Sequence, residues 1–341
     1  MLIYLARRLL LMIPTLFVIS FLVFTIIKLP PGDYLSNQIA ELRAQGEDSA
    51  LQRVEFLRHQ YALDRPFLEQ YAIWIGLWPG PNGLSGLLQG DWGWSFEYNR
   101  PVGELIADRL VMTAIINAGT ILFIYLIAFP IGVYSATRQY SWSDYGFTLL
   151  GYIGLATPNF LLALVLLYYA NVWFGLSMGG LVAPELINAP WGWEKIRSLL
   201  AHMLVPVIVI GTSGTAAMIR RLRANLLDEL QKQYVTTARA KGVPPLRLLL
   251  RYPVRMALNP FVADIGNLLP SIVSGSVIVS VVMSLPTAGP MLLGALQSLD
   301  QYLAGSFLMF LAVLTVVGML ISDILLALLD PRIRLTGGQA K

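Results

Sequence analysis

The sequence predicts an all-α integral membrane protein with about six transmembrane helices. The 341-residue chain is 56% hydrophobic and only 13% charged, a composition outside the usual range of soluble domains. Its uncharged apolar runs reach the roughly 20 residues that a helix needs to cross a bilayer. Lysine and arginine gather at alternate ends of these runs, as they do at the cytoplasmic ends of membrane helices.

The apolar runs define the expected elements in chain order. The candidate spans are Leu9 to Leu29, Leu110 to Ala136, Phe147 to Phe174, Met203 to Ile219, Phe261 to Leu285 and Leu303 to Leu329. The fourth run is short and contains Pro206, Gly211 and Gly214, and the sixth carries Asp323 near its end. These two runs therefore fit the pattern of a membrane span less closely than the others do.

The basic residues predict the orientation. Fifteen of the 24 lysines and arginines fall on one side if both termini are cytoplasmic: Arg7, Arg8, Arg138, nine between Arg220 and Arg255, Arg332, Arg334 and Lys341. Residues 1–30 then form the cytoplasmic end and the first span. We interpret this span as uncleaved, because its apolar run is longer than that of a signal peptide and no small-x-small cleavage site follows.

Residues 31–108 form a large external segment in this topology. It holds five arginines and eleven acidic residues, a net charge of −6, so the basic balance of the whole chain reflects topology and does not indicate nucleic-acid binding. Glu41 to Gln60 favours helix, and Tyr61 to Pro66 breaks it. Gly76 to Gly93 is expected to be a loop near the bilayer interface. Tryptophan is typical of that interface, and four tryptophans lie in or beside this loop: Trp74, Trp78, Trp92 and Trp94.

Residues 109–341 are expected to form the transmembrane core, with a cytoplasmic segment at 220–260. Within it, the polar stretch from Tyr234 predicts a short helix that stops at Gly242, because glycine tolerates the left-handed conformation and Pro244 and Pro245 follow. A polar segment of this kind beside a membrane predicts a soluble partner. Three arginines spaced by four follow, at Arg247, Arg251 and Arg255, and Pro253 predicts that their helix is bent or split.

Motifs of enzymes are missing from the sequence. There is no cysteine, there are only two histidines (His59 and His202), and neither a His-Glu-x-x-His nor a Gly-x-Ser-x-Gly motif occurs. The chain also lacks a phosphate-binding loop of the Gly-x-x-x-x-Gly-Lys-Ser/Thr type. We therefore expect no catalytic residue, no metal site and no bound cofactor, and we interpret His202 as an interfacial residue.

Polar residues inside the apolar runs are candidates for a solute pathway, because a polar solute needs better contacts than hydrocarbon. The candidates are Asn117, Thr157, Pro158, Asn159, Thr212, Ser213, Asn267, Ser271 and Ser274. Helix packing through small residues is the alternative explanation. Asp264 and Asp323 lie near the cytoplasmic boundary, which favours capping or pairing with arginine over a proton relay.

Several segments together resemble the inner-membrane permease subunits of dipeptide, oligopeptide and nickel ABC importers. The matching segments are Arg7 to Leu10, Tyr61 to Pro66, Gly90 to Ser95, Arg100 to Ile106, Tyr234 to Gly242 and Leu329 to Arg334. The resemblance implies a type I ABC importer permease fold in a bacterial inner membrane. It also implies a second homologous permease, two ATPase subunits that hold ATP and magnesium, and an external solute-binding protein.

The resemblance assigns the coupling helix, which docks on the ATPase, to Tyr234, Thr236, Thr237, Ala238, Arg239, Ala240, Lys241 and Gly242. Thr236 stands where the general motif has an acidic residue, and Asn259 replaces a leucine. Leu285 to Pro290 departs from the Pro-Gly-Leu-Gly pattern of the family, which leaves the class of solute open.

Di- or oligopeptides are the solutes that the resemblance implies first, with a nickel chelate, a sugar or an opine-like compound as alternatives. Two other functional classes fit the sequence less well. A lipid-linked transferase would need charged or metal-binding residues clustered at one membrane face, and the sequence offers none. A structural scaffold would not explain the order of the matching segments.

Overall fold

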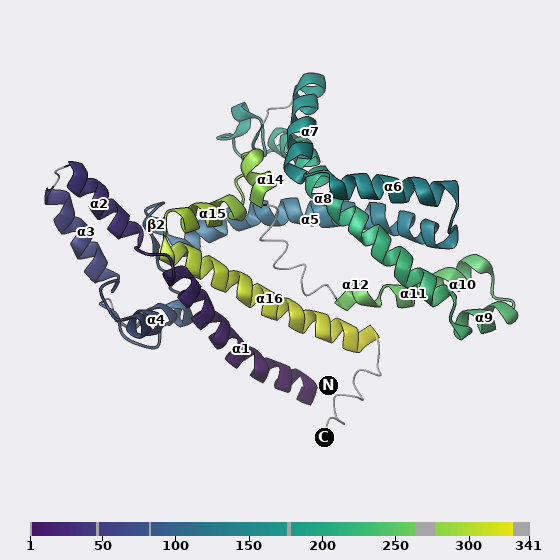
Figure 1. Ribbon diagram of the computed structural model, residues 1–341, viewed down its shortest axis with the longest axis horizontal. Coiled ribbons are helices and arrows are strands. Elements are labelled where there is room, and N and C mark those ends of the chain that lie inside the picture. The colour runs from purple at the N-terminus through teal and green to yellow at the C-terminus, as the bar shows by residue number, and fades with distance from the viewer. Residues whose placement is uncertain (1, 46–47, 82, 176–178, 264–276, 330–341) are drawn as a thin grey trace. The chain divides into compact units, whose positions relative to one another are not determined.

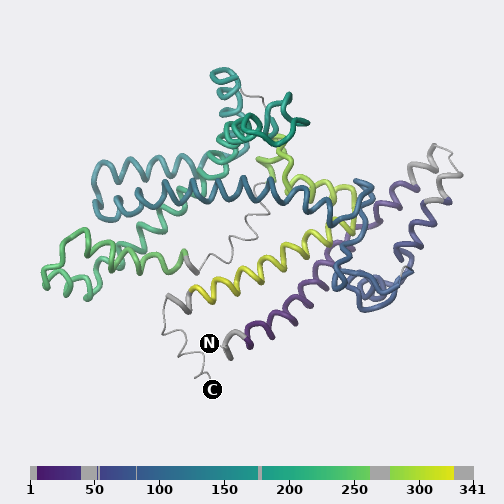
Figure 2. Tube along the Cα trace, turned by 180° about the vertical axis from the view of Figure 1, so that it is seen from behind, coloured from purple at the N-terminus to yellow at the C-terminus, as the bar shows by residue number. Residues whose placement is uncertain are grey.

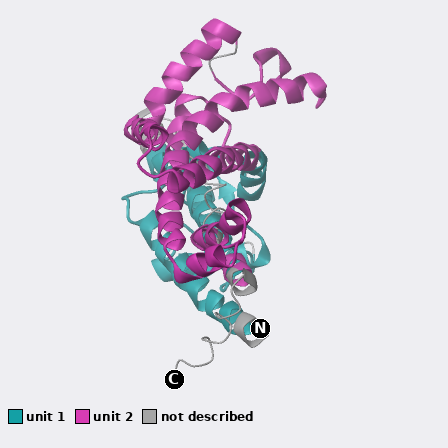
Figure 3. Ribbon diagram, turned by 90° about the vertical axis from the view of Figure 1, so that its right-hand side faces the viewer, with its two compact units in different colours: residues 1–111, 288–320 teal, residues 112–287, 321–341 magenta. Residues whose placement is uncertain are grey.

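The computed structural model describes residues 2–45, 48–81, 83–175, 179–263 and 277–329, which are mostly helical (Figure 1). Figure 2 traces the described residues, coloured from purple near the N-terminus to yellow near the C-terminus. The chain divides into two compact units, one with residues 1–111 and 288–320 and the other with residues 112–287 and 321–341 (Figure 3).

The first unit contains the predicted first span and the predicted external segment. Its elements are α1 (Leu2–Lys28), α2 (Tyr34–Gln45), α3 (Asp48–Gln60), α4 (Phe67–Ile75), the 3-10 turn η1 (Leu87–Gln89), β1 (Trp94–Ser95), β2 (Arg100–Pro101), α15 (Ala288–Gln297) and the start of α16 (Gln301–Leu329). The predicted break at Tyr61 to Pro66 falls between α3 and α4. The two short antiparallel strands are a small addition to the predicted all-α class.

The interfacial placement of Trp74 is wrong. This side chain is only 5% exposed and lies in an apolar cluster with Phe24, Tyr71 and Ile75. Its ring centroid is 5.4 Å from that of Phe24 on α1, so α4 packs on α1 through aromatic contacts. By contrast, Trp78 is 56% exposed, and its interfacial placement stays a prediction.

Polar contacts attach the loops of the first unit to the start of α16. The fully buried carboxylate of Asp300 accepts hydrogen bonds from Ser95 Oγ at 2.6 Å, from the Glu97 N–H at 3.1 Å and from the Leu303 N–H at 3.2 Å. Tyr302 also donates its hydroxyl to the Tyr61 carbonyl at 2.9 Å. Asp300 therefore caps α16 and holds the β1–β2 hairpin at the same time.

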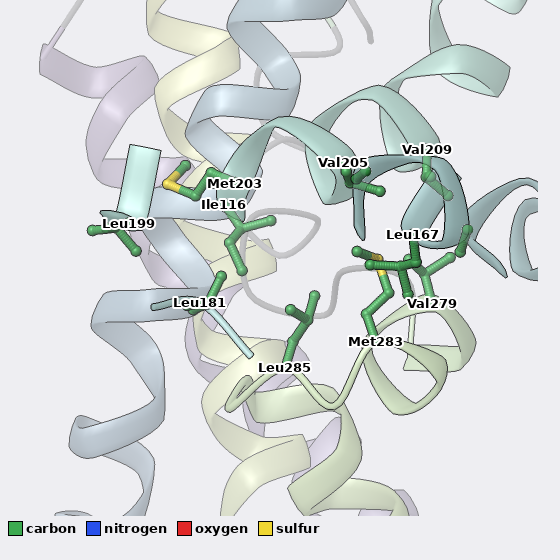
Figure 4. Close-up of a cluster of buried hydrophobic side chains, with 12 residues drawn as sticks. Ile116, Leu167, Leu181, Leu199, Met203, Val205, Val209, Val279, Met283 and Leu285 are labelled. Carbon is green, nitrogen blue, oxygen red and sulfur yellow. The ribbon is translucent and has the colours of Figure 1, made fainter. Parts of the chain in front are cut away.

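The second unit contains most of the predicted transmembrane core. Its elements are α5 (Val102–Thr137, which begins in the first unit), α6 (Trp142–Ala156), α7 (Asn159–Phe174), the 3-10 turn η2 (Pro184–Leu186), α8 (Trp193–Leu230), α9 (Gln233–Ala240), α10 (Pro245–Arg251), α11 (Pro253–Ala257), α12 (Asn259–Ala263) and α14 (Val277–Val282). A buried apolar cluster joins α5, α7, α8 and α14, and Figure 4 shows its side chains.

Four of the predicted spans correspond to helices that are long and apolar enough to cross a membrane. These helices cover Ala6–Lys28, Val102–Thr137, Trp193–Leu230 and Gln301–Leu325. The third of them is 38 residues long and extends well beyond the predicted run. Most of the predicted fifth span, Phe261 to Leu285, lies outside the described residues.

The prediction of one continuous span from Phe147 to Phe174 is wrong. The chain bends by 99° between α6 and α7, which together make at most a broken span or a re-entrant loop. Thr157 has an extended backbone (φ −77°, ψ 121°), as expected for a residue before proline. Pro158 has no N–H to donate to the carbonyl of Gly154, and together with the extended backbone of Thr157 this ends α6 although the sequence stays apolar.

Glycines let α8 approach α5 and α6 closely. A Cβ atom on Gly211 would lie 2.6 Å from the ring of Phe123, and one on Gly214 would lie 2.6 Å from Ile124. On the other side, a Cβ atom on Gly154 would lie 2.8 Å from the methyl group of Thr212. Close packing of helix backbones through small residues is typical of membrane proteins.

Candidate functional site

The predicted docking segment forms α9, a helix with one buried and one exposed face. Val235 and Ala238, spaced three apart, are 1% and 7% exposed. They pack against Leu248 of α10 and the partly buried Val243. The rest of the predicted coupling residues are exposed: Tyr234, Thr236, Thr237, Arg239, Ala240, Lys241 and Gly242.

The predicted stop of this helix at Gly242 is confirmed. Gly242 has a left-handed backbone with φ +75°. Its N–H donates to the carbonyl of Arg239 at 3.0 Å, and the Val243 N–H donates to the carbonyl of Ala238 at 3.3 Å. This pair of bonds is the Schellman motif, and Val243 completes it by packing on the cluster of Val235 and Ala238. The end of α9 is therefore defined by both hydrogen bonds and apolar contact.

The predicted split of the following helix is also confirmed. Tyr252, with φ −113° and ψ −80°, separates α10 from α11, and Pro253 begins the second piece. The three arginines are thus shared between two short helices, and all three are exposed: Arg247, Arg251 and Arg255.

The surface around α9 combines positive charge with apolar area. Lys232 is one of its basic residues, and its Nζ lies 3.9 Å from a carboxylate oxygen of Glu229. The apolar area comes from Leu246 and Leu250, which are 68% and 55% exposed. Tyr234 donates its hydroxyl to Glu229, and burial, together with that carboxylate, raises the pKa of Tyr234. A protein surface with acidic and apolar groups would complement this arrangement.

An ion pair that the sequence analysis did not identify connects this region to α6. Asp144 is 2% exposed, and Arg223 of α8 binds both of its oxygens, with Nε at 2.9 Å and Nη2 at 2.8 Å. Tyr140 also donates its N–H to Asp144 at 3.0 Å, and Ser141 caps α6. The Ser-x-x-Asp spacing of Ser141 and Asp144 marks a helix start and was the available signal for this site.

The structure places the pathway candidates on several elements of the second unit. Asn117 is buried on α5, Ser213 is partly buried on α8, and Pro158 and Asn159 begin α7. The remaining candidates, Asn267, Ser271 and Ser274, lie outside the described residues, as does Asp264. The pathway therefore stays a prediction.

The hydroxyl groups of Thr157 and Thr212 and the ring of His202 lie within hydrogen-bonding distance of backbone carbonyls of their own helices. Thr157 and Thr212 both bond the carbonyl four residues earlier in their helices. His202 is 7% exposed, with Nδ1 2.8 Å from the carbonyl oxygen of Ser198. In the described residues, no group of three or more histidines, cysteines or acids could hold a metal ion.

Comparison with known proteins identifies two matching family models. The model described as the binding-protein-dependent transport system inner membrane component matches residues 128–335, and the N-terminal model of the same class of membrane component matches residues 1–117. Together they cover most of both compact units.

Three relatives match over nearly the whole chain. The oligopeptide transport system permease protein AppB of Bacillus subtilis is 36% identical over 331 residues, which cover 97% of this chain and 98% of the relative. The dipeptide permease DppB of Escherichia coli K12 is 28% identical, with 98% and 99% covered. The glutathione permease GsiC of the same strain is 29% identical, with 98% and 99% covered.

Proposed function

This chain belongs to the family of binding-protein-dependent transport system inner membrane components, and we propose that it lets short peptides cross the membrane in an ATP-driven importer. The names of the relatives support the solute, because they refer to oligopeptides, dipeptides and glutathione. A nickel chelate, a sugar or an opine-like compound would use the same machinery.

A permease of this family works with ATPase and binding-protein components. We propose that this chain pairs with a second homologous permease and that two ATPase subunits bind the pair from the cytoplasm. ATP and magnesium would be held by the ATPases, because the sequence contains no phosphate-binding loop. The chain itself would then catalyse no reaction.

The observation that carries the proposal is the shape of α9. Its apolar face is buried on α10, its polar face is exposed, and its end is locked by Gly242. A helix built in this way can transmit a push or a pull without unwinding. When the ATPases close on ATP, they would move α9 together with the C-terminal end of α8, and the spans would open to the other side.

The orientation that this mechanism needs places both termini and α9 in the cytoplasm of a bacterial cell, with the segment 31–108 outside the inner membrane. The distribution of lysine and arginine supports it. Location-reporting fusions at Ser85 and Lys232 test it directly. An external Lys232 would overturn both the orientation and the role of α9.

Site-directed cross-linking tests the docking role. Because the chain contains no cysteine, each introduced cysteine is its single thiol. Thr236→Cys and Lys241→Cys place single thiols on the exposed face of α9. Gln139→Cys is the control, because it is exposed in the turn between α5 and α6. We expect α9 thiols to cross-link to the co-expressed ATPase much more strongly than the control thiol does.

Uptake by the reconstituted complex tests the solute. Proteoliposomes with both permeases and both ATPases should accumulate a labelled tripeptide only when ATP and the loaded binding protein are present. If α9 cross-links to the ATPase but the complex takes up no peptide, the chain is still an importer subunit and the proposed solute is wrong. Equal cross-linking from α9 and from Gln139→Cys would reject the coupling role.

A further inference from the structure

A cavity of about 300 Å³ lies in the first unit and opens to solvent. Its walls come from the end of α3, from α4, from the glycine-rich loop that follows α4, from the β1–β2 hairpin and from the start of α16. A cavity of this size is at the lower end of the range for small-molecule sites. Neither the coupling mechanism nor the predicted solute pathway uses it.

Aromatic side chains form much of the wall, namely Tyr61, Trp74, Trp94 and Tyr302. The wall is held in place by contacts that do not depend on a ligand. Tyr302 donates to the carbonyl of Tyr61, and Gly93 lies so close to Tyr302 that a Cβ atom would be 2.4 Å from its ring. Trp74 is fixed in the apolar cluster with Phe24. The cavity is therefore preformed.

Asp91 is the charged group of this cavity. No lysine, arginine or other acid is among the described residues that line it, and no ion pair of the described residues involves Asp91. Ser85 Oγ donates to one oxygen of Asp91, and the Gly93 N–H donates to the other at 2.9 Å. These bonds orient the carboxylate and leave each oxygen able to accept a further hydrogen bond.

Tyr61 offers a second polar group to the same space. Within the described residues, its hydroxyl makes no hydrogen bond to the protein. Burial, and then the charge of Asp91, raise the pKa of Tyr61, so the hydroxyl stays protonated at neutral pH. Asp91 and Tyr61 therefore line the same cavity with polar oxygen atoms.

An aromatic wall with one oriented carboxylate is the chemistry that recognises an organic cation. Ring faces attract cations, and a carboxylate forms a charge-assisted hydrogen bond with an N–H donor. We propose that this external cavity binds a primary ammonium group on a short organic chain, specifically the free amino terminus of a short peptide. Three N–H donors of the ammonium group would then meet Asp91 and the oxygen of Tyr61, beside the aromatic rings.

This inference rests on the proposed function for the identity of the solute, since a peptide delivered from outside carries such an amino terminus. The cavity would hold the peptide at the external side before passage. The ammonium group of a lysine on the binding protein is the other source of the same chemistry, and the experiment separates the two.

The probe is leucine amide, compared with N-acetyl-leucine amide, which has the same side chain without the charge. Both are titrated into the full permease complex in nanodiscs by calorimetry, at about pH 6.5, where the α-amino group with its pKa of ~8 is protonated. We expect leucine amide to bind at least tenfold more tightly than the acetylated compound, a difference of about 1.4 kcal/mol.

Three variants locate the binding. Asp91→Asn retains an acceptor for Gly93 and should abolish the preference for leucine amide. Trp94→Leu keeps apolar volume in the wall and should weaken binding severalfold. Glu55→Gln removes the same charge from an exposed site outside the cavity and should change nothing.

Equal binding of the two amides, or an unchanged preference in Asp91→Asn, would overturn the proposal. The proposal would also fail if the cavity binds only a lysine of the solute-binding protein. In that case Asp91→Asn would weaken binding of the solute-binding protein, and leucine amide would not bind to the wild type. Peptide uptake by the wild-type complex is measured in parallel. If the wild type imports no peptide but Asp91 still decides amide binding, the proposed solute fails and the ammonium site stands.

Discussion

Arg223 reaches from α8 to Asp144 on α6 with two parallel hydrogen bonds, 2.9 Å and 2.8 Å long. The pair joins residues that are 79 positions apart in the chain. Seven residues after Arg223, α8 ends at Leu230, and α9 follows. The ion pair thus fixes the start of α6 to the helix that carries the docking segment.

Breaking this pair should destabilise the second unit. Asp144→Ala removes the partner of Arg223, whose side chain is 26% exposed, so the cost should be below that of a fully buried pair, at about 2 kcal/mol. Thermal unfolding in detergent measures it. The exposed pair of Arg100 and Glu104 is the control, and Glu104→Gln should cost less than ~0.5 kcal/mol. Equal losses in the two variants would contradict a special role for Arg223.

Gly242 should be sensitive to conformation and insensitive to volume. A Cβ atom there would meet nothing within 4 Å, but the φ of +75° is strained for other residues by about 1–2 kcal/mol. Gly242→Val should therefore insert normally and lose ATPase association and transport together, whereas Gly242→Asn, which tolerates this conformation, should retain most of both. Co-purification of the ATPase measures the effect. If the ATPase binds Gly242→Val normally, the conformation of Gly242 has no role in docking the ATPase.

Gly211 should respond to volume instead. Its Cβ atom would lie 2.6 Å from the ring of Phe123, so Gly211→Val must displace that ring or separate α5 from α8, at a cost of about 1–3 kcal/mol. Gly146 on α6 has nothing within 4 Å, which makes Gly146→Val the matched control. We expect lower thermal stability and lower abundance only for the variant at 211. Similar abundance of both proteins would argue against the close packing of α8 on α5.

Asp300 should make the attachment of the β1–β2 hairpin depend on pH. Burial raises the pKa of Asp300, against the opposing hydrogen bonds from Ser95 and the backbone. Because the folded protein then binds this proton more readily than the unfolded chain, the contribution of Asp300 to stability is largest below about pH 4 and falls as pH rises through the higher folded-state pKa. The melting temperature of wild type relative to Asp300→Asn should rise on acidification. A constant difference between the two proteins would contradict this.

Local chemistry made much of the candidate site predictable. A glycine followed by two prolines marks a helix end in any context, and α9 ends with Gly242 in the predicted conformation. Pro253 likewise divides the arginine-bearing helix as its missing N–H requires. Hydrophobic length also located the spans in α1, α5, α8 and α16.

Contacts between distant parts of the chain could not be predicted in the same way. Nothing near Asp300 in the sequence indicates Ser95, which is 205 residues away, and Trp74 carries no local mark of its burial on α1. The error over Phe147 to Phe174 has another cause. Apolar composition measures how much hydrocarbon a segment tolerates, whereas the extended backbone of Thr157 before Pro158 decides its direction. Proline alone does not decide it, because Pro130 and Pro206 remain inside α5 and α8.

The bend after α6 should make the stability of this subunit depend on the second permease that we propose as its partner. The extended backbone at Thr157 turns the next N–H groups away from the carbonyls of Leu155 and Ala156, both of which are exposed residues. Carbonyls without donors cost several kcal/mol in lipid, so water or a neighbouring protein must cover them. Without the proposed second permease, the subunit would expose these unpaired carbonyl groups to lipid. Quality-control proteases would then degrade it faster. Pulse-chase labelling should show a half-life several times shorter without the partner, and an unchanged half-life would mean that the chain shields the bend alone.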